Sequence, residues 1–341
     1  MKIRTVSDEQ IKELAMAEGA DLFGVASVEM YSDYSAEVKK RMTETESTHI
    51  DFMVPPEDSS FFQRISNAVN TLSSAKSVII VGCYAYDEKA VYRHSENELR
   101  GKIARTYLYY PVARRLAERL ALFLRDSGYE ALQGQDVPLK YVAARMGLGC
   151  YGKNGILLTQ KYGSYVALRA VITNAKLSPT NRQAVSFCEE CELCLKACPM
   201  GAIYAPYKVN PRLCINTITR REAYIAPDVR AKMRNWIRGC DICQEVCPVN
   251  RRLIPRKPDA CADFDPDNHT THHGLGELKR FPELSDLSGG DRPETVRRNA
   301  AIALANIGKG RKDALRILEE NIRDANPNLC VYFRWAMDMN G

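Results

Sequence analysis

The chain has 341 residues, of which 45% are hydrophobic and 26% are charged, and its formal net charge is +6. This length and composition are typical of a globular protein of two or three domains, and no apolar run reaches the roughly 20 residues of a membrane span. The N-terminal MKIRTVSDEQ has neither an apolar segment nor a twin-arginine pair, so we expect a cytoplasmic protein that does not contact a membrane. The modest positive charge permits a nucleic-acid partner without requiring one.

The first half of the chain is expected to alternate helices and strands. Ser7 and Gln10 form a capping-box pattern that predicts the start of a helix. A run rich in Val and Ile at 75–86 is typical of a buried strand, and apolar residues at spacings of three and four predict a long helix over 107–126. In chain order, the expected elements are a helix at 7–19, strands at 21–27 and 75–86, a helix at 107–126, a strand and turn at 132–138, a helix at 139–146, and strands at 156–159 and 165–173. This half is therefore predicted to be an α+β domain.

A glycine-rich stretch, GLGCYGKN, covers residues 147–154. It contains the G-x-G-x-x-G spacing of dinucleotide sites, but it follows a predicted helix and precedes strands, whereas a dinucleotide turn runs from strand to helix. We therefore reject a dinucleotide site. Two interpretations remain: the three glycines let the backbone lie close against a large flat cofactor, with Lys153 and Asn154 at its edge, or the stretch is a simple turn.

The strongest signal is the segment FCEECELCLKACP at 187–199, which spaces four cysteines as C-x2-C-x2-C-x3-C-P. This is the spacing of bacterial ferredoxins, in which thiolates on a tightly turning backbone hold an iron-sulfur cluster. A second run, Cys240-x2-Cys243-x3-Cys247-Pro248, repeats the end of the first, and Cys214 stands upstream to supply the missing ligand. Two [4Fe-4S] clusters are therefore expected.

In ferredoxins with two clusters, the last cysteine of each motif ligates the cluster of the other motif. The first cluster is then expected on Cys188, Cys191, Cys194 and Cys247, and the second on Cys198, Cys214, Cys240 and Cys243. Because Cys214 lies far upstream of the second motif, residues 216–236 must loop out of the ferredoxin core.

Zinc and disulfides are the alternative roles for these cysteines. Zinc accepts C-x2-C pairs but does not account for the two x3-Cys-Pro endings, and disulfides do not fit thiols two or three residues apart in a cytoplasmic chain. The other cysteines have no metal spacing and are expected to be core thiols; they are Cys83, Cys150, Cys261 and Cys330.

The C-terminal part is expected to be a basic linker followed by helices. Prolines and paired basic residues at 251–257 predict a solvated connector or, alternatively, a nucleic-acid contact. A capping-box pattern and apolar spacing predict a helix that ends at Gly308 and two further helices near 315–322 and 329–336. This arrangement is similar to a HEAT-type repeat.

The order of these parts and three motifs resemble the epoxyqueuosine reductase family, which is related to the reductive dehalogenases. The motifs are AARMGLGCYGKNGILLT at 143–159, KYGSYV at 161–166 and GCDICQEVCP at 239–248. The resemblance spans nearly the whole chain and implies an α+β fold with three domains. These are a cobalamin-binding α/β sandwich domain over 1–180, a ferredoxin-like double [4Fe-4S] domain over 181–262, and a HEAT-like helical domain over 263–341.

The resemblance also implies a base-off cobalamin held against residues 143–173, with one cluster close to the corrin. The residues assigned to this cofactor are Arg145, Gly147, Gly149, Cys150, Tyr151, Gly152, Lys153, Asn154, Ser164 and Tyr165. Cys150 stands where the family commonly has Trp. The family's catalytic aspartate lies in a longer segment than the one around Asp136, so the candidate proton donors are Asp136, Tyr107 and Tyr110.

The function that follows from the resemblance is the reduction of epoxyqueuosine to queuosine in tRNA. A low-potential donor such as ferredoxin or flavodoxin would supply electrons, and a monomer is expected. The basic face for tRNA is expected to comprise Arg251, Arg252, Arg256, Lys257, Arg297, Arg298, Arg311 and Lys312. Two alternatives stay open: a corrinoid reductase of a small molecule such as an organohalide, and an electron-transfer protein with no substrate of its own.

Overall fold

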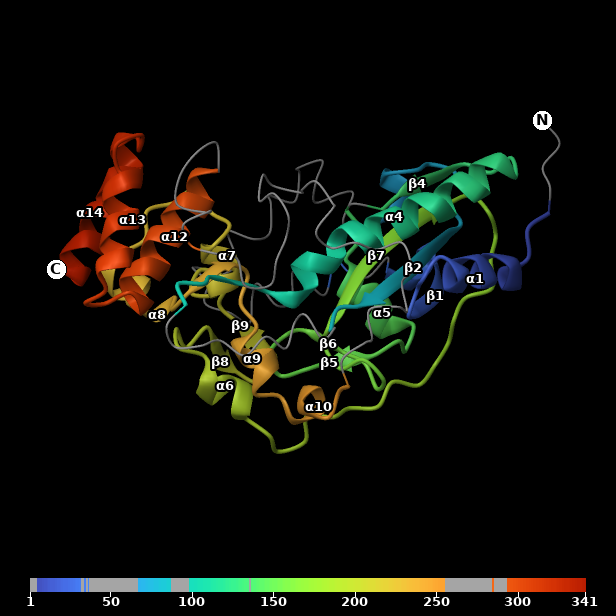
Figure 1. Cartoon of the computed structure of the whole chain (residues 1–341). Coiled ribbons are helices and arrows are strands. Elements are labelled where there is room, and N and C mark those ends of the chain that lie inside the picture. Colours follow the sequence, from blue (N-terminus) through green and yellow to red (C-terminus); the bar gives the residue numbers. More distant parts are fainter. Residues whose placement is uncertain are drawn as a thin grey trace.

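A computed structural model describes residues 5–31, 34, 36, 67–86, 98–134, 136–254, 284 and 293–341. Figure 1 shows a sheet with its helices on one side of the molecule, a group of C-terminal helices on the other, and the cysteine-rich segment between them. Arg256, Lys257 and Cys261, which were singled out in the sequence, lie outside the described residues. Every helix in the described ranges is too short or too polar to cross a lipid bilayer.

The N-terminal part is built on a four-stranded antiparallel sheet with the strand order β1-β2-β7-β4. Its strands are β1 (Leu22–Ser27), β2 (Ser77–Tyr84), β4 (Ala131–Gln133) and β7 (Val166–Thr173). All eight residues of β2 are buried, as expected for a continuous run of β-branched residues covered on both faces. The predicted strands in these regions are confirmed.

Helices cover both faces of this sheet. α1 (Asp8–Ala17) and α4 (Arg105–Asp126) pack on one face, and α5 (Leu139–Arg145) packs on the other. Along β2, Ile79 and Val81 belong to the core under α4, whereas Val78 and Ile80 belong to the core under α5, because side chains alternate along a strand. The layers form the predicted α/β sandwich.

The start of α1 has the predicted capping box. Ser7 Oγ accepts a hydrogen bond from the Gln10 amide at 3.2 Å, and the Ser7 amide donates to Gln10 Oε1 at 3.0 Å. Two short 3₁₀ turns, η1 (Val28–Tyr31) and η3 (Ala68–Asn70), flank the sheet strands.

Two small hairpins lie where the sheet meets the cysteine-rich segment. They are β5 (Cys150–Tyr151) with β6 (Leu157–Leu158), and β8 (Ile203–Ala205) with β9 (Lys208–Val209). The cysteine motifs form short helical turns, namely α6 (Leu193–Ala197), α9 (Ile242–Glu245) and α10 (Pro248–Arg251). Because α6 and α9 contact each other, two motifs far apart in sequence lie side by side.

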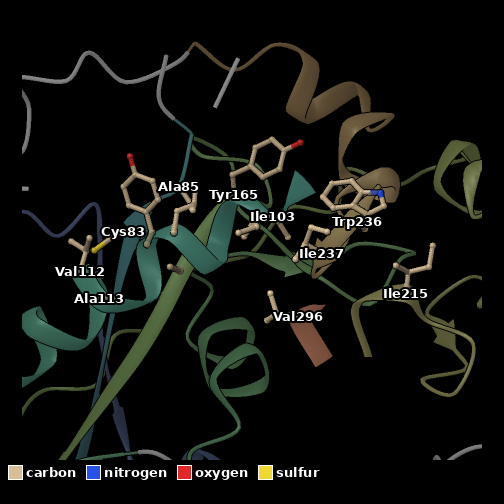
Figure 2. Packing of buried hydrophobic residues seen from close by; sticks show 14 of the residues in the cluster. Cys83, Ala85, Ile103, Val112, Ala113, Tyr165, Ile215, Trp236, Ile237 and Val296 are labelled. Atoms are coloured by element: carbon tan, nitrogen blue, oxygen red, sulfur yellow. The ribbon is translucent and has the colours of Figure 1, made fainter. Parts of the chain in front are cut away.

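The insertion ahead of Cys240 folds out of the ferredoxin core, as predicted. It contains α7 (Ile215–Ile218), α8 (Pro227–Lys232) and β10 (Trp236–Arg238), which pairs in parallel with β3 (Lys102–Ile103). Figure 2 shows Trp236 and Val296 in the same buried cluster as Cys83. One hydrophobic core therefore runs through the sheet, the insertion and the helical tail.

Three helices form the C-terminal tail: α12 (Glu294–Ile307), α13 (Lys312–Asn321) and α14 (Pro327–Asn340). They confirm the predicted helices, and the insertion is the surface on which they dock. The Arg298 guanidinium donates to three backbone carbonyls of residues 218–223 at 2.6, 3.1 and 3.2 Å. Asn299 Nδ2 donates to the carbonyls of Thr219 and Ile237, both at 2.8 Å.

The prediction that Arg297 and Arg298 belong to an exposed basic face is wrong. Their exposed fractions are 7% and 5%. Arg297 pairs with Asp324 at 2.6 Å, while Arg298 is committed to the carbonyls of the insertion. Arg297 joins α12 to the end of α13 within the tail, and Arg298 joins the tail to the insertion. A buried guanidinium with five donors can satisfy several acceptors at once.

Candidate active site

A cavity of about 990 Å³ lies between the sheet and the cysteine-rich segment. Its walls come from the N-terminal ends of α4 and α5, the start of β7, the β5–β6 turn, the β8–β9 hairpin and the cysteine-rich segment. Cofactor and ligand pockets range from about 300 to 1,000 Å³. The cavity is therefore large enough for a bulky cofactor.

Four cysteines line this cavity: Cys198, Cys214, Cys240 and Cys243. They come from three separate stretches of chain, yet they are the four that the ferredoxin pairing assigns to the second cluster. The cysteines assigned to the first cluster are not among the lining residues in the described chain. The predicted second cluster site therefore faces the cavity.

Electrostatic coupling identifies the thiols that lie close together. In one set, Cys214 interacts with Cys198, Cys240 interacts with Cys198 and Cys214, and Cys243 interacts with Cys214 and Cys240. In the other set, Cys194 interacts with Cys188 and Cys191. One further interaction, between Cys243 and Cys194, joins the two sets. In the described ranges, no three His, Cys, Asp or Glu side chains gather as the ligands of a single metal ion, whereas a cubane spreads four thiolates over four irons. The couplings within the two sets involve seven of the predicted ligands, and the place of Cys247 in the first set stays a prediction.

Burial disfavours the ionised thiolate form of these cysteines when no cation is nearby. It raises the pKa of Cys194 to about 11, and it raises the pKa of the Cys214, Cys240 and Cys243 thiols as well. Thiolates in such surroundings are stable when they bind a metal centre, which supplies the compensating positive charge.

Asp241 lies within the C-x2-C motif of the second set and is fully buried, with an exposed fraction of 0%. Its Oδ2 accepts from the Arg105 backbone amide at 2.9 Å, and its Oδ1 accepts from Gln244 Nε2 at 2.8 Å. The Arg105 guanidinium lies 3.4 Å from the same carboxylate. Burial works against the charge of Arg105, but Tyr165 and the neighbouring carboxylates raise its pKa overall, so the guanidinium stays charged.

Ser164, just before β7, ties the sheet to the cysteine-rich segment. Its Oγ donates to Gln244 Oε1 at 2.8 Å and accepts from Asn250 Nδ2 at 2.7 Å, while its amide donates to Asn250 Oδ1 at 2.9 Å. Ser164 also lines the cavity. It is therefore both a candidate cofactor residue and a support for the cavity wall.

Tyr107 and Tyr110, on α4, both line the cavity. The Tyr107 hydroxyl donates to Asn216 Oδ1 at 3.0 Å, and burial raises the pKa of Tyr107 to about 12. Gly239 permits this placement, because its φ is +73° and a Cβ there would lie 2.7 Å from the Tyr107 ring. Because its pKa is raised, Tyr107 carries its proton at neutral pH.

Tyr110 has a cationic neighbour, since the Arg169 guanidinium lies 4.6 Å from the Tyr110 ring centroid.

Asp136 is not among the residues that line the cavity, although residues 137–141 are. Lys140 Nζ donates to the Gly155 carbonyl at 2.8 Å and so joins the start of α5 to the β5–β6 turn. The role of Asp136 as a proton donor stays a prediction.

Side chains of the glycine-rich stretch lie on both sides of the β5–β6 hairpin. Tyr151 and Asn154 line the cavity. Cys150 instead couples to the first cysteine motif, and buried Lys153 donates to a backbone carbonyl of that motif, that of Glu189, at 2.7 Å. Because successive side chains of a strand point to opposite faces, Cys150 and Tyr151 cannot both face the cavity. Cys150 and Lys153 are outside the cavity lining, and their contacts with the cofactor stay a prediction.

The glycines of this stretch are packed against backbone or side chains of the domain, and their predicted role beside the cofactor stays a prediction. Gly147, Gly149 and Gly152 do not line the cavity. A Cβ on Gly147 would overlap the Arg182 carbonyl oxygen, and a Cβ on Gly149 would lie 2.7 Å from the Leu158 carbonyl oxygen. These glycines allow close backbone packing within the domain.

Two further predicted cofactor residues, Arg145 and Tyr165, also lie outside the cavity lining. Tyr165 is buried, and its hydroxyl accepts from the Arg105 guanidinium at 3.0 Å. Tyr165 therefore supports the Arg105–Asp241 pair.

Sequence reasoning missed the cationic character of the cavity. The cations among the described lining residues are Lys140, Arg169, Lys208 and Arg220, and Asp241 is the one carboxylate there. Asn216, Tyr204 and Tyr207 were missed as well. A signal was present, since the turn at 204–208 combines aromatic and basic residues with a proline. Such a lining attracts anionic groups.

Comparison with known proteins identifies the family. Residues 187–250 match the 4Fe-4S double cluster binding domain. A protein of Synechocystis sp. named epoxyqueuosine reductase is 36% identical over 228 residues, which cover 64% of this chain and 76% of that protein. The chain belongs to the epoxyqueuosine reductase family. A Bacillus subtilis epoxyqueuosine reductase is 28% identical over 359 residues, covering 98% of this chain and 87% of the relative.

Solved epoxyqueuosine reductases share this fold. One from Bacillus subtilis, with its catalytic loop swung out of the active site, has a TM-score of 0.77 at 25% identity, covering 98% of this chain and 90% of that chain. Another, bound to an epoxyqueuosine-modified tRNA stem loop, has a TM-score of 0.79 at 25% identity with the same coverage. The family, the α+β fold class, the iron-sulfur clusters and the oxidoreductase class predicted from the sequence are confirmed.

Proposed function

We propose that this chain reduces epoxyqueuosine in tRNA to queuosine. The observation that carries the proposal is the cavity, in which one wall holds the four cysteines of a predicted cluster and another holds two tyrosines. A relative named epoxyqueuosine reductase aligns with nearly the whole chain, and a solved relative binds an epoxyqueuosine-modified tRNA stem loop. The cavity is the proposed active site.

Cobalamin suits this cavity on the chemistry of its walls. The volume is about 990 Å³, Tyr151 offers a flat surface, and Asn154 offers an amide for the amide-fringed corrin. Lys140 and Arg169 add positive charge that suits the phosphate of the nucleotide tail. We therefore assign base-off cobalamin to this site, where it would supply low-potential two-electron chemistry at a carbon-oxygen bond.

The two clusters supply the electrons. The cysteines that line the cavity would hold the second cluster, beside cobalamin, and the other four would hold the first cluster. An external donor such as ferredoxin or flavodoxin would reduce these clusters. We expect the chain to act as a monomer in the cytoplasm.

The reaction also needs protons. Removal of the epoxide oxygen consumes two electrons and two protons: two C–O bonds break, a C=C bond forms, and the oxygen leaves as water. Tyr107 and Tyr110 line the cavity and can donate to the leaving oxygen. Asp136 is the third candidate; it is outside the cavity lining here, and the catalytic loop of the Bacillus subtilis relative is swung out of its active site.

Turnover tests this proposal. Protein purified anaerobically and supplied with reduced viologen, cobalamin and epoxyqueuosine-containing tRNA should form queuosine, which nucleoside analysis detects. Cys214→Ala protein is the matched control and should form none. Reduction of an organohalide without queuosine formation, or electron transfer to another protein without turnover of the tRNA, would contradict the proposal.

A further inference from the structure

We propose that the β8–β9 hairpin and the turn after it bind unstacked nucleotides of an RNA loop at the mouth of the cavity. Bases would stack on Tyr204 and Tyr207, and phosphates would meet the cations Lys208, Arg212 and Arg220. This inference rests on the proposed function and names the part of the RNA, and the residues, that bring the modified nucleoside to the cavity.

The two tyrosines are partly exposed aromatic residues at the cavity. Tyr204 is 47% exposed and Tyr207 is 44% exposed, and both belong to the cavity lining. Tyr204 lies on β8, and Tyr207 lies within the turn, since Ala205 pairs with Lys208. Exposed aromatic faces beside a cavity are suited to stack on a flat ligand, and any nucleobase provides one.

Tyr207 is held in a backbone conformation that its side chain does not favour. Its φ is +66°, in the left-handed region that Gly or Asn adopts far more readily. The turn is fixed by a hydrogen bond of 2.9 Å from the Tyr207 amide to the Lys153 carbonyl. Lys153 is itself buried and anchored to the first cysteine motif. The left-handed turn therefore does not account for a tyrosine at this position. Residues with strained backbone conformations of this kind cluster at functional sites.

The cations around the hairpin have no carboxylate partners in the described part of the chain. Lys208, Arg212 and Arg220 are exposed, and no ion pair between described residues includes them. Arg212 lies close enough to Arg221 for their like charges to repel. Cations gathered without counter-charges are typical of surfaces that bind phosphates.

A single-stranded loop fits these features better than a duplex. A nucleoside can enter a cavity only when its base leaves the stack, and its neighbours then remain at the rim with their faces open. Stacked base pairs in a duplex offer no such faces to Tyr204 and Tyr207. The hairpin therefore matches the nucleotides that flank the modified one in an anticodon loop.

Tyr207→Gly is the most informative variant, because glycine suits the left-handed turn and removes only the ring. We expect Tyr207→Gly and Tyr204→Ala each to weaken binding of an unmodified anticodon stem-loop RNA about tenfold or more. Iron and cobalamin contents should match those of the parent protein. Tyr224→Ala is the matched control, since Tyr224 is 67% exposed and does not line the cavity.

Charge is tested separately through salt dependence. Lys208→Gln and Arg212→Gln should each reduce the slope of log K against log salt by about 0.7, and a hairpin-free RNA duplex should bind the tyrosine variants and the parent protein equally. Unchanged stem-loop affinity in Tyr207→Gly and Tyr204→Ala would overturn the inference. Loss of cobalamin in these variants would also overturn it, because the rings would then belong to the cofactor wall.

The same experiment separates this inference from the proposed function. If the parent protein binds the stem loop through the two tyrosines but forms no queuosine, the inference stands and the proposed function fails. If the parent protein forms queuosine and the tyrosine variants show an unchanged KM, the proposed function stands and the inference fails.

Discussion

The carboxylate of Asp241 and the backbone amide of Arg105 are joined by a hydrogen bond of 2.9 Å. This bond ties the first turn of α4 to the C-x2-C motif whose cysteines face the cavity. The Arg105 guanidinium adds a charge contact to Asp241 at 3.4 Å and lies 4.6 Å from the Tyr165 ring centroid. The cavity wall and the cluster segment are therefore held together by a buried charge pair.

Loss of one partner in this pair should destabilise the protein strongly. Arg105→Gln leaves the Asp241 carboxylate buried without its counter-charge, so we expect the free energy of unfolding to fall by about 3 to 5 kcal/mol. Lys12→Gln is the control, because it breaks only an exposed pair with Glu9 and should cost less than about 1 kcal/mol. Urea unfolding followed by circular dichroism measures both. Equal effects of the two substitutions would show that the buried pair contributes little.

Cys214 should be required for one cluster alone. Because it is coupled to Cys198 and Cys240 at the cavity, Cys214→Ala should lower the iron content from about eight to about four per chain. The remaining cluster should keep its electron paramagnetic resonance signal. Cys330→Ala removes a thiol that donates a hydrogen bond to the Ala325 carbonyl, and it should leave the content at about eight irons per chain. A complete loss of iron in Cys214→Ala would argue against the two separate sets.

Tyr107 should make stability depend on alkaline pH. Burial raises its pKa from 10.0 to about 12. Below pH 10 the phenol is protonated in both the folded and the unfolded chain and contributes nothing to the pH dependence. Between pH 10 and about 12 the unfolded chain releases this proton while the folded chain keeps it, so stability falls as pH rises.

Tyr107→Phe isolates this contribution. Unfolding free energies at about pH 9 and about pH 11 should fall less steeply with pH in the variant than in the parent protein. Ultraviolet difference spectra should also lack one late-titrating phenolate. Identical pH slopes for the two proteins would show that the Tyr107 hydroxyl ionises as freely in the folded state as in the unfolded state.

Arg298 should act on stability rather than on RNA charge. Arg298→Leu removes the donors that hold three carbonyls of the insertion, and a hydrogen bond to a charged group contributes about 1.5 to 3 kcal/mol. The thermal midpoint should fall, whereas Arg323→Gln, an exposed change on the same tail, should leave it unchanged. A variant that keeps its midpoint but loses RNA binding would restore Arg298 to the basic face.

The elements and the double-cluster domain could be predicted from the sequence, because both depend on local patterns. The run of Val and Ile in β2 and the spacing of cysteines from Cys188 onward need no tertiary information to be recognised. The cavity wall depended on which face of a short hairpin each side chain takes. Tyr151 and Cys150 are neighbours in sequence, yet only Tyr151 lines the cavity, and a resemblance to a motif cannot separate them.

Buried cations were the second point at which sequence reasoning failed. Arginine is usually a surface residue, but Arg298 is buried because its guanidinium donates to backbone carbonyls of the insertion before Cys240. That insertion is a long-range feature, and its docking partner lies more than sixty residues away along the chain. The cations that do line the cavity, such as Lys208, lie next to a turn whose role only the tertiary structure reveals.

The most direct measurement is an anaerobic crystal structure of the protein reconstituted with iron, sulfide and cobalamin. We predict that cobalt lies in the cavity beside Tyr107 and Tyr110, and that its neighbouring cluster is bound by Cys198, Cys214, Cys240 and Cys243. Cobalamin bound outside this cavity, or beside the cluster held by Cys188, Cys191, Cys194 and Cys247, would contradict the account.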